Sequence, residues 1–78
     1  MIKIKFFGFL KKFMPEVNDD GFWCIDTEGV TIAEIFDAAN VPEEYRRATL
    51  LVNRMRKDMD YKLQKGDVLT VMPLVAGG

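Results

Sequence analysis

Histidine and serine are absent from this sequence of 78 residues, and cysteine occurs once, as Cys24. Without histidine and with one thiol, the chain cannot assemble a zinc site from cysteine and histidine ligands, nor a cysteine–histidine nucleophilic pair. Without serine, it cannot be a serine hydrolase. One cysteine also allows no internal disulfide, which suits a reducing cytosol. We therefore expect a cytoplasmic protein that binds no metal and no cofactor of its own.

An excess of basic charge and long apolar runs are also missing. Eleven Lys and Arg residues against twelve Asp and Glu residues give a net charge of -1, whereas a nucleic-acid-binding protein normally gathers a basic excess on one face. No apolar run approaches the roughly 20 residues of a membrane-spanning helix, and the start, MIKIKFFGFL, lacks the apolar region of a signal peptide. We expect neither nucleic acid nor a membrane as a partner. Carboxylates, lysines and tyrosines are present, but no arrangement of them points to catalysis.

What the sequence does contain is the composition of one small globular domain. Hydrophobic residues make up 49% and charged residues 29% of the chain, both ordinary values. A chain of this size buries roughly 60–65% of its unfolded surface, which leaves a modest stability margin. We expect residues 1–73 to form the domain and residues 74–78 to form a flexible C-terminal tail.

Four segments have the pattern of β-strands. Ile2, Ile4 and Phe6 alternate with lysines, as in a half-buried strand. Residues 22–27 and 48–53 are rich in strand-forming side chains, and residues 68–72 form the closing strand. Residues 54–67 hold at most a short edge strand, followed by a turn at 65–67.

Residues 32–39 carry the strongest helix pattern, with apolar side chains at i, i+3, i+4 and i+7. Thr31 and Glu34 form the T-x-x-E sequence of a capping box. Asn40 can adopt the left-handed conformation that commonly ends a helix. A second, short amphipathic helix is predicted in FLKKFM, residues 9–14, with an apolar stripe on one side formed by Phe9, Leu10, Phe13 and Met14. PEEYRR at 42–47 is compatible with one more helical turn.

The predicted order is therefore strand, strand, helix, strand, short strand, strand. Two hairpins that flank one helix, with strands at both ends of the chain, must pack as one mixed sheet with the helix across one face. We predict an α+β fold with four to five strands and one main helix. This architecture is the β-grasp of ubiquitin-like proteins.

The sequence ends with MPLVAGG, so that Gly77 and Gly78 are its last residues. Because glycine has no Cβ, a Gly-Gly segment can lie extended in a slot that is too narrow for any side chain. The five residues after Pro73 reach about 17 Å when they are extended. That length could carry the terminal carboxylate into the buried active site of another protein. We therefore interpret the terminal carboxylate as the reactive group.

With these features the chain resembles the family of ubiquitin-like sulfur carriers, and within it the small subunits of molybdopterin synthase. The resemblance covers IKIKFFGFL, GVTIAEIFDAA, LLVN, the L-x-x-G-D turn and the VAGG ending. It implies that an E1-like enzyme uses ATP to adenylate Gly78, which is then converted to a thiocarboxylate. It also implies that Val75, Ala76 and Gly77 thread into the large subunit of molybdopterin synthase, where sulfur passes to a pterin precursor of the molybdenum cofactor. The protein would then be a sulfur-bearing co-substrate, and its partners would do the acid–base chemistry.

Other pathways within and beyond this family stay open. Thiamine sulfur carriers resemble the chain in fold and tail, but they typically join the first two strands more tightly than residues 8–21 do here. Leu74 stands where the family commonly has a second tail proline, which keeps a tungsten cofactor pathway and a ubiquitin-like protein modifier as alternatives. A non-catalytic interaction module with an incidental diglycine is a further alternative.

The closing strand also predicts a surface for partners. If Thr70 faces solvent, alternation sends Leu69 and Val71 inward and places Met72 and Leu74 on the open face of the sheet. Exposed apolar residues beside a reactive tail indicate a partner-binding surface.

Two further features have a structural and a functional interpretation. Cys24 lies among apolar neighbours in the second predicted strand, so we predict a core residue rather than a relay thiol. The basic sequence RMRK at 54–57 could dock an acidic partner, but we predict a solvated turn.

Overall fold

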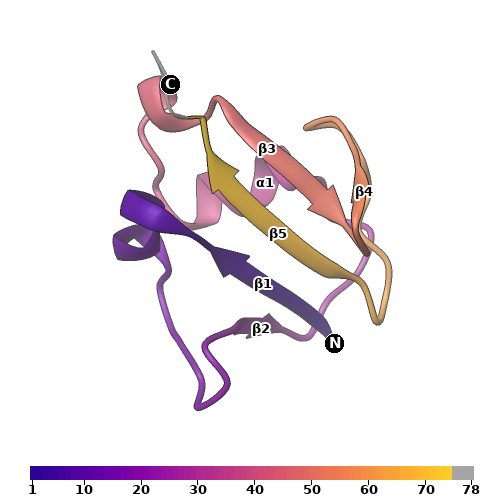
Figure 1. Cartoon of the computed structure of the whole chain (residues 1–78). Helices are drawn as coiled ribbons and strands as arrows, with labels where there is room; N and C mark the ends of the chain where they lie inside the picture. The colour runs from indigo at the N-terminus through magenta and orange to yellow at the C-terminus, as the bar shows by residue number, and fades with distance from the viewer. Residues whose placement is uncertain (75–78) are drawn as a thin grey trace.

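The computed structural model describes residues 1–74, which form one five-stranded mixed sheet with a single α-helix across one face (Figure 1). The elements, in chain order, are β1 (Ile2–Phe6), the 3₁₀-helix η1 (Gly8–Phe13), β2 (Trp23–Ile25), α1 (Ile32–Ala38), the 3₁₀-helix η2 (Glu43–Tyr45), β3 (Ala48–Val52), β4 (Met55–Arg56) and β5 (Val68–Pro73). The strand order is β2-β1-β5-β3-β4, and β1 pairs parallel with β5 while the other pairs are antiparallel. The predicted α+β, β-grasp fold is confirmed.

The strands lie where the sequence predicts them, with small differences at their ends. β2 is shorter than predicted and covers only Trp23–Ile25. β3 ends at Val52 because Asn53 and Arg54 adopt positive φ angles of 52° and 72°, which turn the chain tightly into β4. Within residues 1–74, no helix is long and apolar enough to cross a membrane.

The predicted capping box sets the start of α1. The side-chain hydroxyl of Thr31 accepts a hydrogen bond from the backbone N–H of Glu34 at 3.1 Å, and the Glu34 carboxylate accepts one from the backbone N–H of Thr31 at 2.8 Å. Two further amides of the first turn, those of Ile32 and Ala33, donate to carbonyl groups of residues 59–61. Asn40, with φ of 56°, takes the left-handed position after the helix as predicted.

The short helix predicted at residues 9–14 is the 3₁₀-helix η1. Its tighter turn changes which of its side chains are buried. A 3₁₀-helix has three residues per turn, so residues three apart share a face. Leu10 and Phe13 pack against the core, whereas Phe9 is 51% exposed. The prediction that Phe9 belongs to the same buried stripe is therefore wrong, because it assumed the α-helical period.

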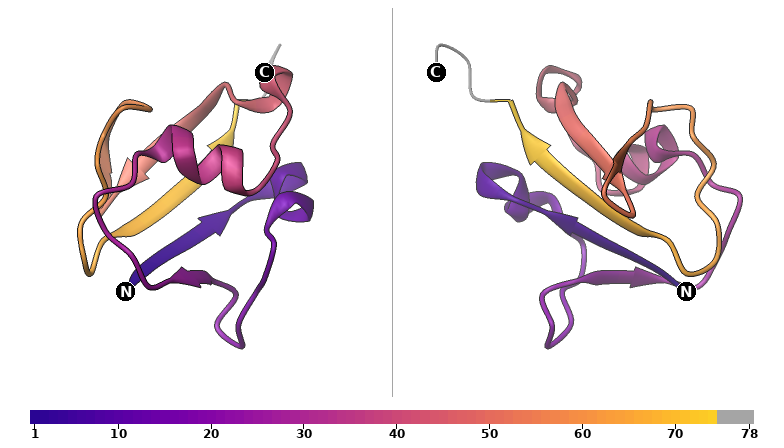
Figure 2. Two further views of the ribbon diagram at one scale, coloured as in Figure 1. Left: turned by 180° about the vertical axis from the view of Figure 1, so that it is seen from behind. Right: turned by 45° about the vertical axis from the view of Figure 1, so that its right-hand side comes forward.

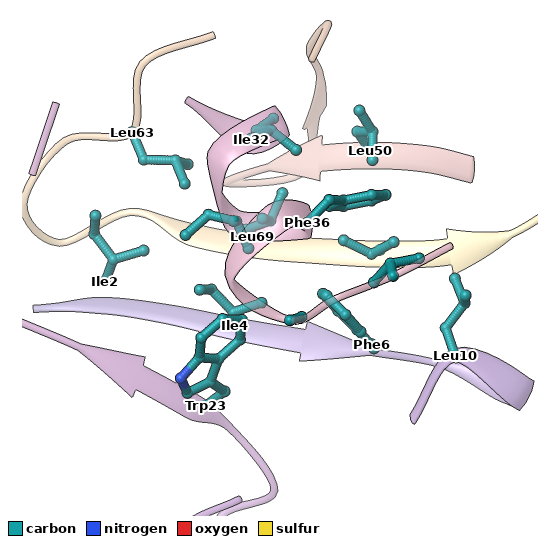
Figure 3. Packing of buried hydrophobic residues seen from close by; sticks show 14 of the residues in the cluster. Ile2, Ile4, Phe6, Leu10, Trp23, Ile32, Phe36, Leu50, Leu63 and Leu69 are labelled. Carbon is teal, nitrogen blue, oxygen red and sulfur yellow. The ribbon is translucent and has the colours of Figure 1, made fainter. Parts of the chain in front are cut away.

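The core lies between the sheet and α1 (Figure 3). Alternate residues of the strands face the helix, and side chains of η1 and of the loops close the ends. The buried hydrophobic side chains are Ile2, Ile4, Phe6, Leu10, Trp23, Ile32, Ile35, Phe36, Ala39, Val41, Leu50, Val52, Leu63, Leu69 and Val71. Phe6 is central, since its ring contacts Trp23 edge-on and packs at a tilt against Phe36, with centroids 6.4 Å and 5.8 Å apart.

The opposite side of the sheet is not covered by α1, as the front and back views show (Figures 1 and 2). We call this side the open face. Because successive side chains of a strand point to opposite sides, its strand residues are the ones that alternate with the core: Lys3, Lys5, Cys24, Thr49, Leu51, Val68, Thr70 and Met72.

Cys24 belongs to this open face and not to the core, so its predicted core position is wrong. It pairs with Lys3 across β1 and β2, is only partly buried, and its sulfur accepts a hydrogen bond from the Asn18 side-chain amide at 3.3 Å. The apolar neighbours of Cys24 in the sequence suggested burial. However, the adjacent Trp23 points to the helix side of β2, so Cys24 points to the opposite side. The thiol thus contacts a loop residue on the side away from the core.

Candidate partner-binding site at the end of β5

The last described residues leave the sheet from its centre. β5 lies between β1 and β3, and its end pairs Ala48 with Pro73 on the β3 side. On the β1 side, the backbone N–H of Phe7 donates to the carbonyl of Val71 at 2.9 Å. Two strands therefore fix the position and direction of the end of β5.

Gly8 allows the chain to pass close beside this point. Its φ of 61° is a conformation that side chains rarely adopt, and a Cβ at this position would lie 2.9 Å from Cγ of Pro73. Glycine is thus required both by the turn out of β1 and by the contact with the end of β5. This contact holds η1 against the last residues of the strand.

Exposed apolar side chains gather around this end of β5. Met72 and Leu74 are 36% and 57% exposed, and Phe9 and Tyr45 are 51% and 37% exposed. The rings of Phe9 and Tyr45 make an edge-to-face contact with centroids 5.5 Å apart, which joins η1 to η2. Figure 1 shows η1 and η2 near the end of β5. We call Phe9, Tyr45, Met72 and Leu74 the exit patch.

The open face continues from the exit patch toward the middle of the sheet. Lys5, Thr70 and Leu51 lie in one row across β1, β5 and β3. The Lys5 ammonium group lies over the rings of Phe7 and Phe22, at 5.4 Å and 5.2 Å from their centroids. This combination of a leucine, a threonine and a lysine stacked on aromatic rings suits contact with another protein.

Met72 and Leu74 have the exposed positions that the sequence predicts, and Leu69 and Val71 are fully buried as predicted. Phe9 and Tyr45 are exit-patch residues that the sequence analysis missed. The signal that could have found Phe9 is the 3₁₀ period, whereas the exposure of Tyr45 depends on contacts between distant segments. Val75, Ala76, Gly77 and Gly78 lie outside the described residues.

The acidic and thiol side chains of the described residues form no cluster at the exit patch. Within residues 1–74, no group of three or more Cys, Asp or Glu side chains could hold a metal ion. The buried carboxylate, that of Asp67, lies at the other end of β5 and serves as a hydrogen-bond acceptor within the fold. It accepts hydrogen bonds from the Asn53 side chain at 2.9 Å and from the Gln64 backbone at 2.8 Å. The exposed apolar side chains of the exit patch are therefore the feature of this end of the domain that suits contact with another protein.

A comparison with protein families decides what kind of protein this is. The sequence model of the ThiS family matches residues 4–78. The chain belongs to the ThiS family. Members of this family are ubiquitin-like sulfur carriers, which generally work with E1-like adenylating enzymes and further partner enzymes. The match includes the exit patch and the residues that follow it. A search of curated proteins found no match to the chain.

Proposed function

We propose that this ThiS-family protein carries sulfur as a thiocarboxylate on Gly78 and donates it to a pterin precursor in molybdopterin synthesis. The family match, which runs through residue 78, is the observation that carries the sulfur-carrier role. The exit patch supports it, because exposed apolar side chains flank the point from which the tail continues.

The chemistry of the terminal group follows from its poor reactivity. A carboxylate is a weak acylating agent, so an E1-like enzyme first joins it to the α-phosphate of ATP and releases pyrophosphate. Hydrosulfide then attacks the acyl carbon and AMP leaves, which yields the thiocarboxylate. ATP is therefore a substrate of the activating enzyme, and this chain needs no resident cofactor.

Each part of the site has a role in delivery. The residues after Pro73 span at most about 17 Å, which allows Gly78 to reach a buried active site while Met72 and Leu74 contact the rim of the partner. Val75, Ala76 and Gly77 pass through the slot. Because the activating enzyme and the sulfur-accepting enzyme need the same tail and the same exit patch, they bind in turn and compete.

The connection between β1 and β2 favours the molybdopterin branch over the thiamine branch. Residues 8–21 include the 3₁₀-helix η1, which supplies Phe9 to the exit patch. A tight connection between the first two strands would lack this helix. The corresponding partner is the large subunit of molybdopterin synthase, with a basic pocket for a phosphorylated pterin, and the cytoplasm is the compartment in which we place the reaction.

Deletion of Gly78 tests the assignment of the reactive residue. Because the fold of residues 1–74 does not include it, the shortened protein should unfold at the same urea concentration as the full chain. It should form no acyl-adenylate when incubated with the cognate E1-like enzyme and ATP. An acyl-adenylate or thiocarboxylate on the shortened protein would contradict the assignment.

The choice of pathway needs a separate assay. The thiocarboxylated protein is supplied to a molybdopterin synthase large subunit with the pterin precursor, and in parallel to a thiazole synthase with its substrates. We expect a dithiolene product in the first reaction only. A thiazole product in the second reaction only would assign the protein to thiamine synthesis, and conjugates of Gly78 on lysines of cellular proteins would indicate a protein modifier.

A further inference from the structure

An open groove of about 600 Å³ lies beside the exit patch. It is lined by residues of the segment that leads into β3, by Ala48 and Leu50 of β3, by residues 56–61, and by Leu74. The presence of Leu74 means that the groove begins where the tail leaves the domain. Any protein that takes up the tail therefore passes over or beside this groove.

The groove exists because the chain leaves the edge of β3 early. β4 covers only Met55–Arg56, and the last contact with β3 is the hydrogen bond from the Lys57 N–H to the Leu50 carbonyl, at 3.1 Å. Residues 59–61 then turn to α1, where the carbonyl groups of Met59 and Tyr61 accept hydrogen bonds from amides of the first helical turn at 3.0 Å and 3.2 Å. The backbone of residues 59–61 therefore stabilises the start of α1 and does not continue the pairing of β4 with β3.

The first half of β3 is thus a free strand edge. Successive residues of an antiparallel strand direct their backbone N–H and C=O groups to opposite sides. Leu50 directs its carbonyl to the β4 side, so Ala48, two residues earlier, directs its own groups to the same side. β4 has no residue opposite Ala48, and Ala48 lines the groove. An added strand could pair there.

The side chains around the groove favour an acidic ligand. Four of them are cationic, Arg46, Arg47, Arg56 and Lys57, against two carboxylates, Asp58 and Asp60, although the whole chain has a net charge of -1.

The four cations are not equally available to a ligand. Arg46 is held by Asp37 at 2.7 Å and by the Val41 carbonyl at 2.8 Å, and the Lys57 ammonium group lies 5.0 Å from the ring centroid of Tyr61. Arg47 and Arg56 are exposed and make no ion pair within residues 1–74. These two arginines are therefore the groups that a ligand would meet.

We propose that this groove binds an extended acidic segment of the E1-like enzyme that takes up the tail, by pairing with the free edge of β3 at Ala48. The proposal rests on the sulfur-carrier function, because it names the chemistry of a second contact with the same partner. It gives Arg56 and Lys57 of the RMRK sequence a role in docking, in place of the predicted solvated turn. The acidic segment would contact Arg47 and Arg56 while the exit patch contacts the rim of the slot.

A peptide titration tests the groove without any partner enzyme. The ¹⁵N-labelled protein is titrated with a capped peptide of alternating aspartate and valine, and with two controls: the same peptide with lysine for aspartate, and with proline for valine. We expect amide shifts at Arg47, Ala48 and Lys57, slower hydrogen exchange of the Ala48 amide, and weaker responses to both controls. Equal shifts with the lysine peptide, or shifts confined to the open face, would overturn the proposal.

Charge reversal tests the same contact in the complex. The double variant Arg47→Glu/Arg56→Glu should bind the cognate E1-like enzyme about tenfold more weakly at low salt, with the difference shrinking as salt is added. The matched control Lys62→Glu/Lys65→Glu makes the same charge change at exposed positions that do not line the groove. Equal loss of affinity in both variants, or none in either, would refute an ionic docking site.

The two proposals fail separately in these experiments. If the wild-type chain is never adenylated, the sulfur-carrier proposal is wrong for this protein, and the peptide titration still decides whether the groove binds acidic strands. If the wild-type chain is adenylated and the arginine variant behaves like its control, the groove proposal alone is wrong.

Discussion

On β5, Val71 is fully buried beneath α1, whereas the next residue, Met72, is 36% exposed on the open face. The same contrast separates Trp23, 6% exposed, from its neighbour Cys24 on β2. The helix side of the sheet therefore buries the apolar side chains that stabilise the fold, and the open face remains available for contact with other proteins. Because alternate residues of one strand serve these two purposes, single substitutions should affect one and spare the other.

The largest effect on stability is expected on the helix side. Phe36 is fully buried in α1 and packs against Phe6, so Phe36→Ala should lower the free energy of unfolding by about 3–5 kcal/mol. Urea denaturation of the variant and of Phe9→Ala, an exposed phenylalanine in the exit patch, provides the comparison. If Phe9→Ala lowered the free energy of unfolding as much as Phe36→Ala, the exit patch would contribute to stability as the core does, and the contrast between the two surfaces would be wrong.

The largest effect on binding is expected at the exit patch. The double variant Met72→Asp/Leu74→Asp should weaken binding to the activating enzyme by several kcal/mol, because unpaired carboxylates would be buried in an apolar contact. Its unfolding midpoint should stay near that of the wild type, since both side chains are exposed. Calorimetric titration measures the affinity. Unchanged affinity for both the activating enzyme and the sulfur acceptor would remove these residues from the interface.

An intermediate effect is expected at Gly8, where the chain turns from β1 into η1. Gly8→Ala introduces a Cβ at positive φ and 2.9 Å from Pro73, which should cost about 1–2 kcal/mol of stability. Because Pro73 is displaced, the rate of adenylation should fall as well. The matched substitution Gly66→Ala also has a positive φ but meets no atom within 4 Å, so an equal fall in its adenylation rate would contradict the positioning role.

The smallest effect is expected at Cys24 on the open face. Cys24→Ala removes the hydrogen bond from the Asn18 amide at a partly buried position, and it should change stability by about 0.5 kcal/mol or less. Sulfur transfer should continue at the wild-type rate in a single-turnover assay with the thiocarboxylated protein. A well-folded variant that fails to transfer sulfur would instead make Cys24 a relay thiol.

The regular elements could be predicted because each depends on local chemistry. The capping residues Thr31 and Glu34 and the alternation of Ile2, Ile4 and Phe6 fix α1 and β1 within the sequence itself. The two faces of β5 also followed from alternation, and with them the exposure of Met72.

The remaining features depend on contacts between distant segments. The side to which Cys24 points is set by its pairing with Lys3, and the burial of Leu10 without Phe9 depends on the tighter turn of η1. The groove beside Ala48 arises because residues 59–61 bond to α1 and not to β3. Neither the pairing nor the diverted backbone has a signature in the local sequence.

The sulfur-carrier function is tested most directly by the mass of the protein itself. The protein is purified from its own cells without acid treatment, and its intact mass and its C-terminal fragment are measured, before and after incubation with the cognate E1-like enzyme, ATP and a sulfur donor. We predict a fraction whose mass corresponds to one oxygen replaced by sulfur, located on Gly78, and an increase of that fraction after incubation. A C-terminal fragment that carries only a carboxylate under both conditions would contradict the function proposed here.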